Sequence, residues 1–170
     1  YVLYQDTVNE ETNIFLKTST DNGKSFSTPV RVNLLDGNVA LDGRVAPTIQ
    51  LGDNGEVYVT WANSRYEPNM FMGNYRQLVF TQSFDDGKSF EPSIIIGAEE
   101  LASGKYFQHM SIDGYGGIHM AWLDGPAKMN ATGYMEKDES RDRGVRYVQS
   151  LDGGVTFDTT KLIDTNACPC

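Results

Sequence analysis

An eight-residue pattern, here called the octad, occurs three times along the chain. Each octad reads Ser-x-Asp-x-Gly-x-Ser/Thr-Phe, and the octads start at residues 19, 83 and 150, which are 64 and 67 residues apart. The fixed positions are Ser19, Asp21, Gly23 and Phe26; Ser83, Asp85, Gly87 and Phe90; and Ser150, Asp152, Gly154 and Phe157. An Asp can accept backbone N–H groups in a tight turn, and a Gly can adopt the positive φ that such a turn needs. We therefore expect three hairpin turns, with hydroxyl groups hydrogen-bonding across the hairpin and the final Phe in the core.

A second pattern recurs in step with the octads. A Gly-rich turn leads into a segment in which every second residue is apolar, and these residues are Val57, Val59 and Trp61 in one copy and Ile118, Met120 and Trp122 in the next. A period of two predicts a strand with one buried face. The segments just before the octads alternate as well. One unit therefore reads as four antiparallel strands, which in the middle of the chain lie at about 45–51, 56–63, 77–84 and 90–96.

Four strands in each repeat of this length are typical of a blade of a β-propeller. The predicted fold class is all-β, with four-stranded antiparallel blades. We expect a partial blade at 1–33, complete blades at 44–97 and 105–164, and the start of a further blade or a link at 165–170. Because about three blades would leave sheet edges exposed, we expect them to belong to a larger ring. The remaining blades would come from the same chain or from another subunit.

The charge of the chain excludes some classes of partner. Lys and Arg total 14 and Asp and Glu total 23, so the formal net charge is −9. A surface that follows nucleic-acid phosphates needs clustered basic residues, and so does a surface that docks on anionic lipid. The sequence also has no apolar run near the ~20 residues of a membrane-spanning helix. We therefore expect no nucleic-acid partner and no membrane span.

The octads resemble Asp boxes, also called BNR repeats, of the sialidase-like β-propellers, and the resemblance extends over essentially the whole chain. A recurring Trp/Tyr-x-Asp/Asn triplet follows the second strand of each unit, at Tyr4–Asp6, Trp61–Asn63 and Trp122–Asp124. This triplet is most similar to that of secreted Asp-box proteins. The resemblance implies an extracellular, periplasmic or cell-surface location.

Strand direction divides the loops between two faces. The octad turns and the Gly-rich turns share one face, whereas the loops between second and third strands and the links between units share the other. In sialidase-like enzymes the active site lies on the face away from the Asp boxes. The resemblance therefore makes the basic residues of that face a candidate ligand-binding rim, namely Arg65, Arg76, Arg141 and Arg143.

A sialidase would need further groups at this rim. The family grips a carboxylate with arginines and uses a Tyr nucleophile, a Glu partner and an Asp acid/base. Its first arginine stands in a Phe/Tyr-Arg-Ile/Leu-Pro segment, which Gly43–Pro47 matches only in part. By this resemblance Arg44 and Asp124 are the catalytic candidates, with Asp124 as acid/base. The spacing assigns no Tyr and Glu pair.

Cys168 and Cys170 leave three interpretations open. Two Cys residues separated by one residue do not easily bond to each other, so disulfides to other cysteines, free thiols and binding of a soft metal all remain. His109 and His119 have no second ligand at short spacing, so we predict no metal site at the histidines, and no cofactor.

Three functions follow in order of preference. The first is a secreted or cell-surface module that recognises a glycan or a protein through the rim opposite the octads. The second is a glycoside hydrolase of the exo-sialidase type, with a site completed by other blades. The third is a structural subunit of a surface assembly.

Overall fold

The computed structural model describes residues 1–34, 39–65, 75–97, 104–125, 127–129, 135–137, 144–165 and 167. Within these residues the chain forms β-strands and one short 3-10 helix, η1, at Gly43–Val45. The described residues contain no helix that is both long and apolar enough to cross a membrane. The all-β fold class predicted from the sequence is confirmed.

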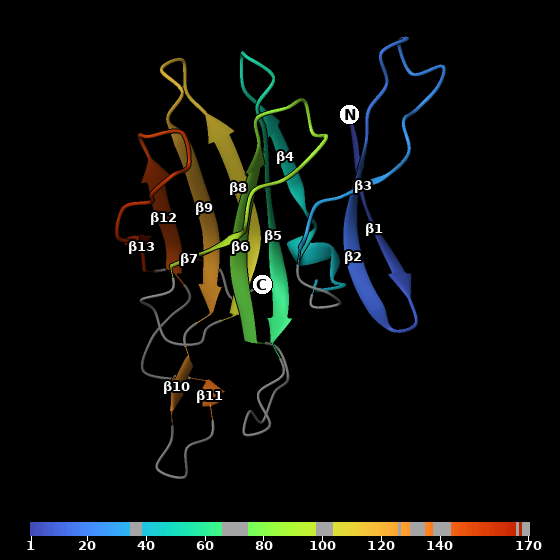
Figure 1. Cartoon of the computed structure of the whole chain (residues 1–170). Helices are drawn as coiled ribbons and strands as arrows, with labels where there is room; N and C mark the ends of the chain where they lie inside the picture. Colours follow the sequence, from blue (N-terminus) through green and yellow to red (C-terminus); the bar gives the residue numbers. More distant parts are fainter. Residues whose placement is uncertain are drawn as a thin grey trace.

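Three antiparallel sheets stand side by side along the chain (Figure 1). The first sheet has three strands and the order β1-β2-β3, with β1 at Val2–Val8, β2 at Glu11–Lys17 and β3 at Val30–Arg31. The second has the order β4-β5-β6-β7, with strands at Thr48–Leu51, Val57–Arg65, Tyr75–Ser83 and Ile94–Ile96. The third has the order β13-β12-β9-β8, with β8 at Gly104–Ile112, β9 at Ile118–Gly125, β12 at Gly144–Ser150 and β13 at Lys161–Asp164. A separate hairpin pairs β10 at Ala127–Met129 with β11 at Met135–Lys137.

Some strand ends differ from the sequence-based expectation. Strand β4 begins at Thr48 rather than near residue 45, because Val45 belongs to η1 and Pro47 separates η1 from the strand. The Asp42 side chain accepts the N–H of Arg44 and so caps η1. Strand β7 starts at Ile94 rather than near residue 90. The β10–β11 hairpin was not expected between the second and third strands of its unit.

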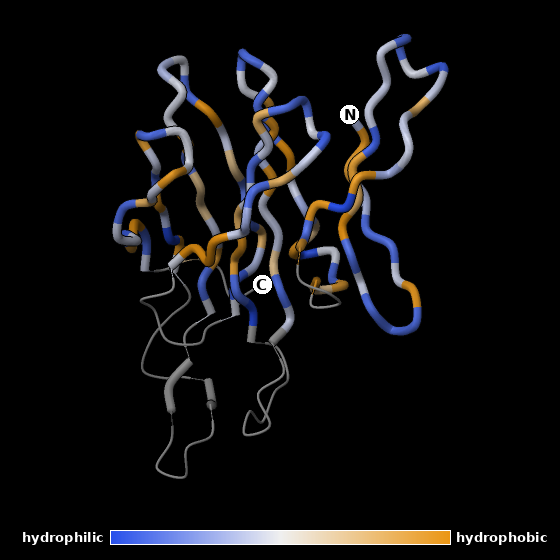
Figure 2. The backbone as a smooth tube through the Cα atoms, viewed as in Figure 1, coloured by the Kyte–Doolittle hydropathy of each residue, from blue (hydrophilic) through white to orange (hydrophobic). Residues whose placement is uncertain are grey.

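Two separate apolar layers hold the sheets together. The layer between the first and second sheets contains Ile14 and Leu16 from β2 together with Val57, Val59 and Trp61 from β5. The layer between the second and third sheets contains, among others, Leu78, Phe80, Met110, Ile118, Met120 and Trp122. The predicted alternation in β5 and β9 is confirmed, since its apolar residues are at most 1% exposed. Figure 2 shows apolar residues along the strands and hydrophilic residues in the turns.

The three octads form the same hydrogen-bonded turn. In each, the Asp Oδ1 accepts the hydroxyl of the first Ser, at 2.8, 2.7 and 2.8 Å in chain order. The Ser Oγ accepts the N–H of the Gly at 2.8, 2.9 and 2.8 Å. The hydroxyl at the seventh position donates to the Asp Oδ2 at 2.6, 2.6 and 2.5 Å. The sequence predicted hydroxyl groups that hydrogen-bond across the hairpin. In the structure they bond to the Asp within the turn instead.

The octad Phe residues differ in burial. Phe90 is 9% exposed and belongs to the first apolar layer, and Phe157 packs edge-on against Phe80 with ring centroids 5.1 Å apart. Phe26 is 46% exposed, so the prediction of a buried ring is wrong there. The reason is that these rings pack on the sheet that precedes their own, and no described sheet precedes the first.

The two groups of turns lie at opposite ends of the sheets, as strand direction predicted. Figure 1 shows the octad turns and the Gly-rich turns at the top of the view. The link that carries η1 lies toward the other end, together with the ends of β5 and β9 and the start of β6. We call that second end the basic rim, for the side chains described next.

Candidate ligand-binding site

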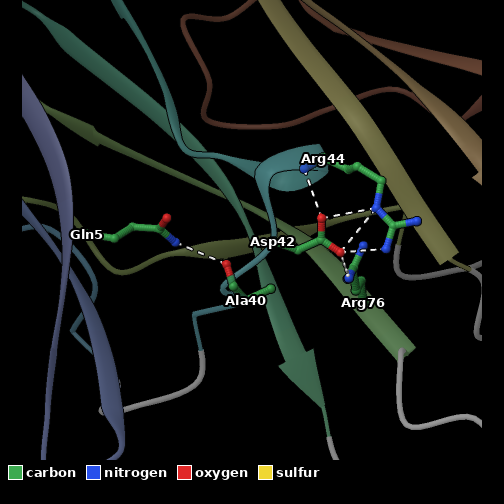
Figure 3. A network of polar contacts seen from close by, with 5 residues as sticks. All are labelled: Gln5, Ala40, Asp42, Arg44 and Arg76. Carbon is green, nitrogen blue, oxygen red and sulfur yellow. Dashed lines mark hydrogen bonds and ion pairs between the residues drawn. The ribbon is translucent and has the colours of Figure 1, made fainter.

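The structure brings together a predicted catalytic candidate, Arg44, and a predicted rim residue, Arg76. Arg44 in η1 and Arg76 near the start of β6 bind the same carboxylate, that of Asp42 (Figure 3). The Arg44 backbone N–H and Nε donate to Asp42 Oδ1 at 2.9 and 3.0 Å, and Arg44 Nη2 donates to Oδ2 at 2.6 Å. Arg76 Nη2 donates to Oδ2 at 2.6 Å as well. One carboxylate therefore links the segment before β4 to β6.

The bonds to Asp42 favour its ionised form. The Arg44 side chain, the Arg44 backbone N–H and Arg76 hold the pKa of this carboxyl well below its usual range. Sequence reasoning missed Asp42. An Asp two residues before Arg44, in front of a turn that ends at a proline, was a capping signal that could have found it.

Tyr106 of β8 joins this group from the third sheet. The guanidinium carbons of Arg44 and Arg76 lie 4.9 and 4.8 Å from its ring centroid. Two contacts of this kind are worth roughly 0.5–2 kcal/mol each, depending on their exposure to water. The same residue packs against a small buried group formed by Ala40, Val45 and Ala62. The Asp42 cluster, which comprises Asp42, Arg44, Arg76 and Tyr106, therefore spans the second and third sheets.

Arg76 is the least satisfied member of the cluster. Its side chain is 5% exposed, and its Nε and Nη1 atoms are buried with no hydrogen-bond partner among the described residues. A buried guanidinium normally bonds through several of its nitrogens, because burial removes the water that would otherwise bind them. Arg44 differs, since its side chain is 53% exposed. The cluster thus combines a buried cation that has spare donors with an accessible cation beside it.

A second polar group adjoins the Asp42 cluster along β8. Lys105, the neighbour of Tyr106, lies with its Nζ 5.1 Å from the ring centroid of Trp122. Opposite Lys105 on β9 is Asp124, which accepts the Nε–H of Arg146 at 3.2 Å. The side chains of Asp124 and Arg146 are 7% and 14% exposed. Together the two groups hold the cationic side chains Arg44, Arg76, Lys105 and Arg146 and the carboxylates Asp42 and Asp124, in a chain of net charge −9.

The other predicted site residues are placed only in part. Arg65 is the last residue of β5, at this rim, and the structure does not describe its side chain. Arg141, Arg143, Cys168 and Cys170 lie outside the described residues. The roles of Asp124 and Arg44 in catalysis stay predictions.

The histidines stand apart from the basic rim. His119 bonds to the Tyr147 hydroxyl at 2.6 Å and to Asp113 Oδ2 at 2.9 Å, and His109 Nδ1 lies 3.0 Å from a backbone carbonyl. Within the described ranges no three His, Cys, Asp or Glu side chains gather as a metal site would require.

The arrangement of the sheets is shared with a known enzyme, although the sequence alone matches no known family. No protein-family model matches the sequence, and no curated protein matches it. Among solved structures, the chain is similar to the α-L-arabinanase of Penicillium chrysogenum in complex with arabinobiose, with a TM-score of 0.55 and 15% sequence identity. That enzyme is a β-propeller. The chain folds as part of a β-propeller.

The similarity has a defined extent. It covers 92% of this chain and 43% of the arabinanase, so the chain spans less than half of the length of that enzyme. At this sequence identity the likeness concerns the fold alone. The three sheets are accordingly three successive blades. The resemblance of the octads to Asp boxes and the sialidase-like type stay predictions.

Proposed function

We propose that the chain is a glycan-recognition module of a secreted or cell-surface protein, and that the basic rim binds an acidic glycan. The observation that carries this proposal is the pairing of the buried Arg76, which has two spare donor atoms, with the exposed guanidinium of Arg44. Arginine suits this role because its planar fork of N–H groups matches a carboxylate.

Electrostatics supports an anionic ligand. The two groups at the basic rim hold two more cations than carboxylates, whereas the chain as a whole carries −9. An anion would therefore be repelled by most of the surface and attracted at this rim. Because the repulsion is long-range, added salt would screen it first and would weaken the short contacts of the ligand with the exposed Arg44 less.

The structural likeness supports a carbohydrate ligand. The similar solved structure is an arabinanase in complex with arabinobiose, a propeller that holds a sugar. That the ligand is acidic is inferred instead from the basic side chains at the rim of this chain.

Calorimetry with defined oligosaccharides tests the proposal. Trigalacturonate and sialyllactose carry carboxylates, and arabinobiose is a neutral comparison. We expect binding of at least one acidic oligosaccharide and a loss of at least about tenfold in affinity in Arg44→Gln, because a hydrogen bond to a charged group is removed. Lys88→Gln makes the same charge change at an exposed octad side chain and should bind as the parent does. Equal binding by both variants, or no binding of either acidic sugar, would disprove the acidic-glycan proposal.

A glycoside hydrolase of the exo-sialidase type is the second candidate. Arg44 and Asp124 lie toward the same end of the sheets, which is where that function would place a carboxylate grip and an acid/base. A fluorogenic sialoside separates the two functions. Turnover that disappears in Arg44→Ala would establish an enzyme, and binding without turnover would leave the recognition module. Secretion is tested by fractionating the cells that produce the protein.

A further inference from the structure

Both internal blade interfaces use the same parts of the octad. A Cβ atom added to Gly87 would lie 2.5 Å from Leu16 of the preceding blade, and one added to Gly154 would lie 2.8 Å from the Phe80 ring of the blade before it. The Phe157 ring also packs on Phe80. Gly87 and Gly154 therefore lie against the strand that leads into the octad of the preceding blade, β2 and β6 respectively, and only glycine leaves room for this contact.

The first blade has the same parts, and they are more exposed there. A Cβ atom added to Gly23 would meet no atom within 4 Å. Phe26 is 46% exposed, against 9% for Phe90 in the second blade. Val2 on β1 is 44% exposed, whereas Val59, at the equivalent position of β5, is 0% exposed. We call this surface of the first blade the front face.

The third blade presents the matching surface at the other end of the row. Leu16, Phe80 and Tyr147 each stand three residues before an octad Ser, and the first two are 1% exposed. Tyr147 is only half-buried. It stacks on His119 at 6.0 Å and 20°, as Phe80 stacks on Tyr58 at 6.2 Å and 22°. The surface around Tyr147, here the back face, thus repeats the surface that already receives an octad glycine and phenylalanine.

We propose that a second copy of this chain packs its front face on the back face of the first. In this contact Gly23 of one copy lies over Tyr147 of the other, and Phe26 meets the same ring edge-on. The proposed contact repeats the two interfaces between blades inside the chain. The residues of the front face and the back face stand at positions that are buried in those two interfaces. Such a contact is head-to-tail and joins two different surfaces.

Charge limits the strength of this association. Each copy carries −9, so two copies repel each other over distances comparable with the screening length. In the proposed contact itself two aromatic rings meet, those of Phe26 and Tyr147, and the Tyr147 hydroxyl is already hydrogen-bonded within its own copy to His119 and Gln149. We therefore expect the association to strengthen with salt, whereas an association driven by ion pairs would weaken.

Sedimentation velocity of the 170-residue chain, from micromolar to submillimolar concentration, tests the proposal. We expect concentration-dependent association that weakens at least about tenfold in Phe26→Ser, because this ring loses its buried area. Phe84→Ser is the matched control, since Phe84 is 59% exposed in the middle octad, whose glycine already packs within the chain. A chain that stays monomeric, or an association that Phe26→Ser leaves unchanged, overturns the proposal.

Disulfide trapping tests the contact directly. One protein would carry Phe26→Cys and the other Tyr147→Cys, both with Cys168→Ser and Cys170→Ser. We expect the mixture to form a disulfide-linked pair under mild oxidation, and a mixture with Phe84→Cys in place of Phe26→Cys to form none. Failure of the first mixture to cross-link, or equal cross-linking in both, contradicts the predicted contact.

Discussion

Arg76 Nη2 lies 2.6 Å from Asp42 Oδ2, although 34 residues separate the two side chains along the sequence. Asp42 precedes β4 and Arg76 stands near the start of β6. The contact therefore holds the segment before β4 against the first residues of β6. Arg76 is buried, and within the described part of the chain Asp42 is the one carboxylate that it hydrogen-bonds. The stability of the rim therefore depends strongly on Asp42.

Asp42→Asn should lower the free energy of unfolding by about 3 kcal/mol, because it leaves a buried guanidinium without its counter-charge. Urea denaturation measures this difference. Asp86→Asn is the control, since Asp86 pairs with Lys88 at 3.8 Å between two exposed side chains, and it should change stability by less than about 0.5 kcal/mol. Equal effects of the two substitutions would contradict the role assigned to Asp42.

The octads make the stability sensitive to acid. Hydrogen bonds from Ser25 and Thr156 are the largest causes that lower the pKa of Asp21 and Asp152 to about 2, against 3.8 in the unfolded chain. A folded pKa below the unfolded one means that the stabilisation is complete above about pH 4 and disappears as the pH falls toward 2. The urea midpoint should therefore decrease over this interval.

Asp21→Asn identifies the source of that decrease. Its difference in stability from the parent protein should be largest near neutral pH and should shrink between pH 4 and 2, where the parent carboxylate becomes protonated. A difference that stays constant across this range would show that ionisation of Asp21 contributes nothing.

Two octad glycines separate backbone strain from packing. Gly154 and Gly23 have φ values of +88° and +81°, so alanine at either position costs about 1 kcal/mol in the backbone. Gly154→Ala also forces its Cβ against Phe80, which should add about 1–3 kcal/mol. Thermal denaturation at low protein concentration, where copies do not associate, measures both variants. Similar losses would exclude the packing contribution.

Phe107 is held in a strained backbone conformation. Its φ is +53°, it lies where the pairing of β8 with β9 shifts register, and its side chain is 59% exposed. Asn adopts positive φ more readily than Phe, so Phe107→Asn should stabilise the protein by roughly 0.5–1 kcal/mol. Phe84 is equally exposed and does not have a positive φ, so Phe84→Asn should give no gain in stability. A loss of stability in Phe107→Asn would mean that the exposed ring makes a contact in solution.

The sheets were predictable because their signals are local. The alternation of Val57, Val59 and Trp61 marks a strand whichever sheet it joins, and the octad turn is built from bonds within a few residues of Asp85. The exposure of Phe26 was not predictable in this way, because burial of that ring depends on a neighbouring blade and not on the octad.

The site was less predictable than the sheets. Arg44 and Arg76 were identified through the resemblance to sialidase-like propellers, which makes basic residues on the face away from the octads candidates for a site. The contacts of Arg76 with Asp42 and with the Tyr106 ring were missed, since both join segments more than 25 residues apart and no local spacing marks them. The bond of Asp42 to Arg44 was within reach of the sequence, because it follows from the capping position of Asp42. The register shift in β8 was missed for a similar reason, because a bulge is defined by the partner strand.

The two apolar layers share no described residue, and each contains a single tryptophan, Trp61 in one and Trp122 in the other. An outer blade can therefore separate from the middle blade while the apolar layer on the other side of the middle blade stays intact, as in other stacked repeat proteins. The indole fluorescence of single-tryptophan variants would then report on each apolar layer separately. Unfolding could begin with the first blade or with the third.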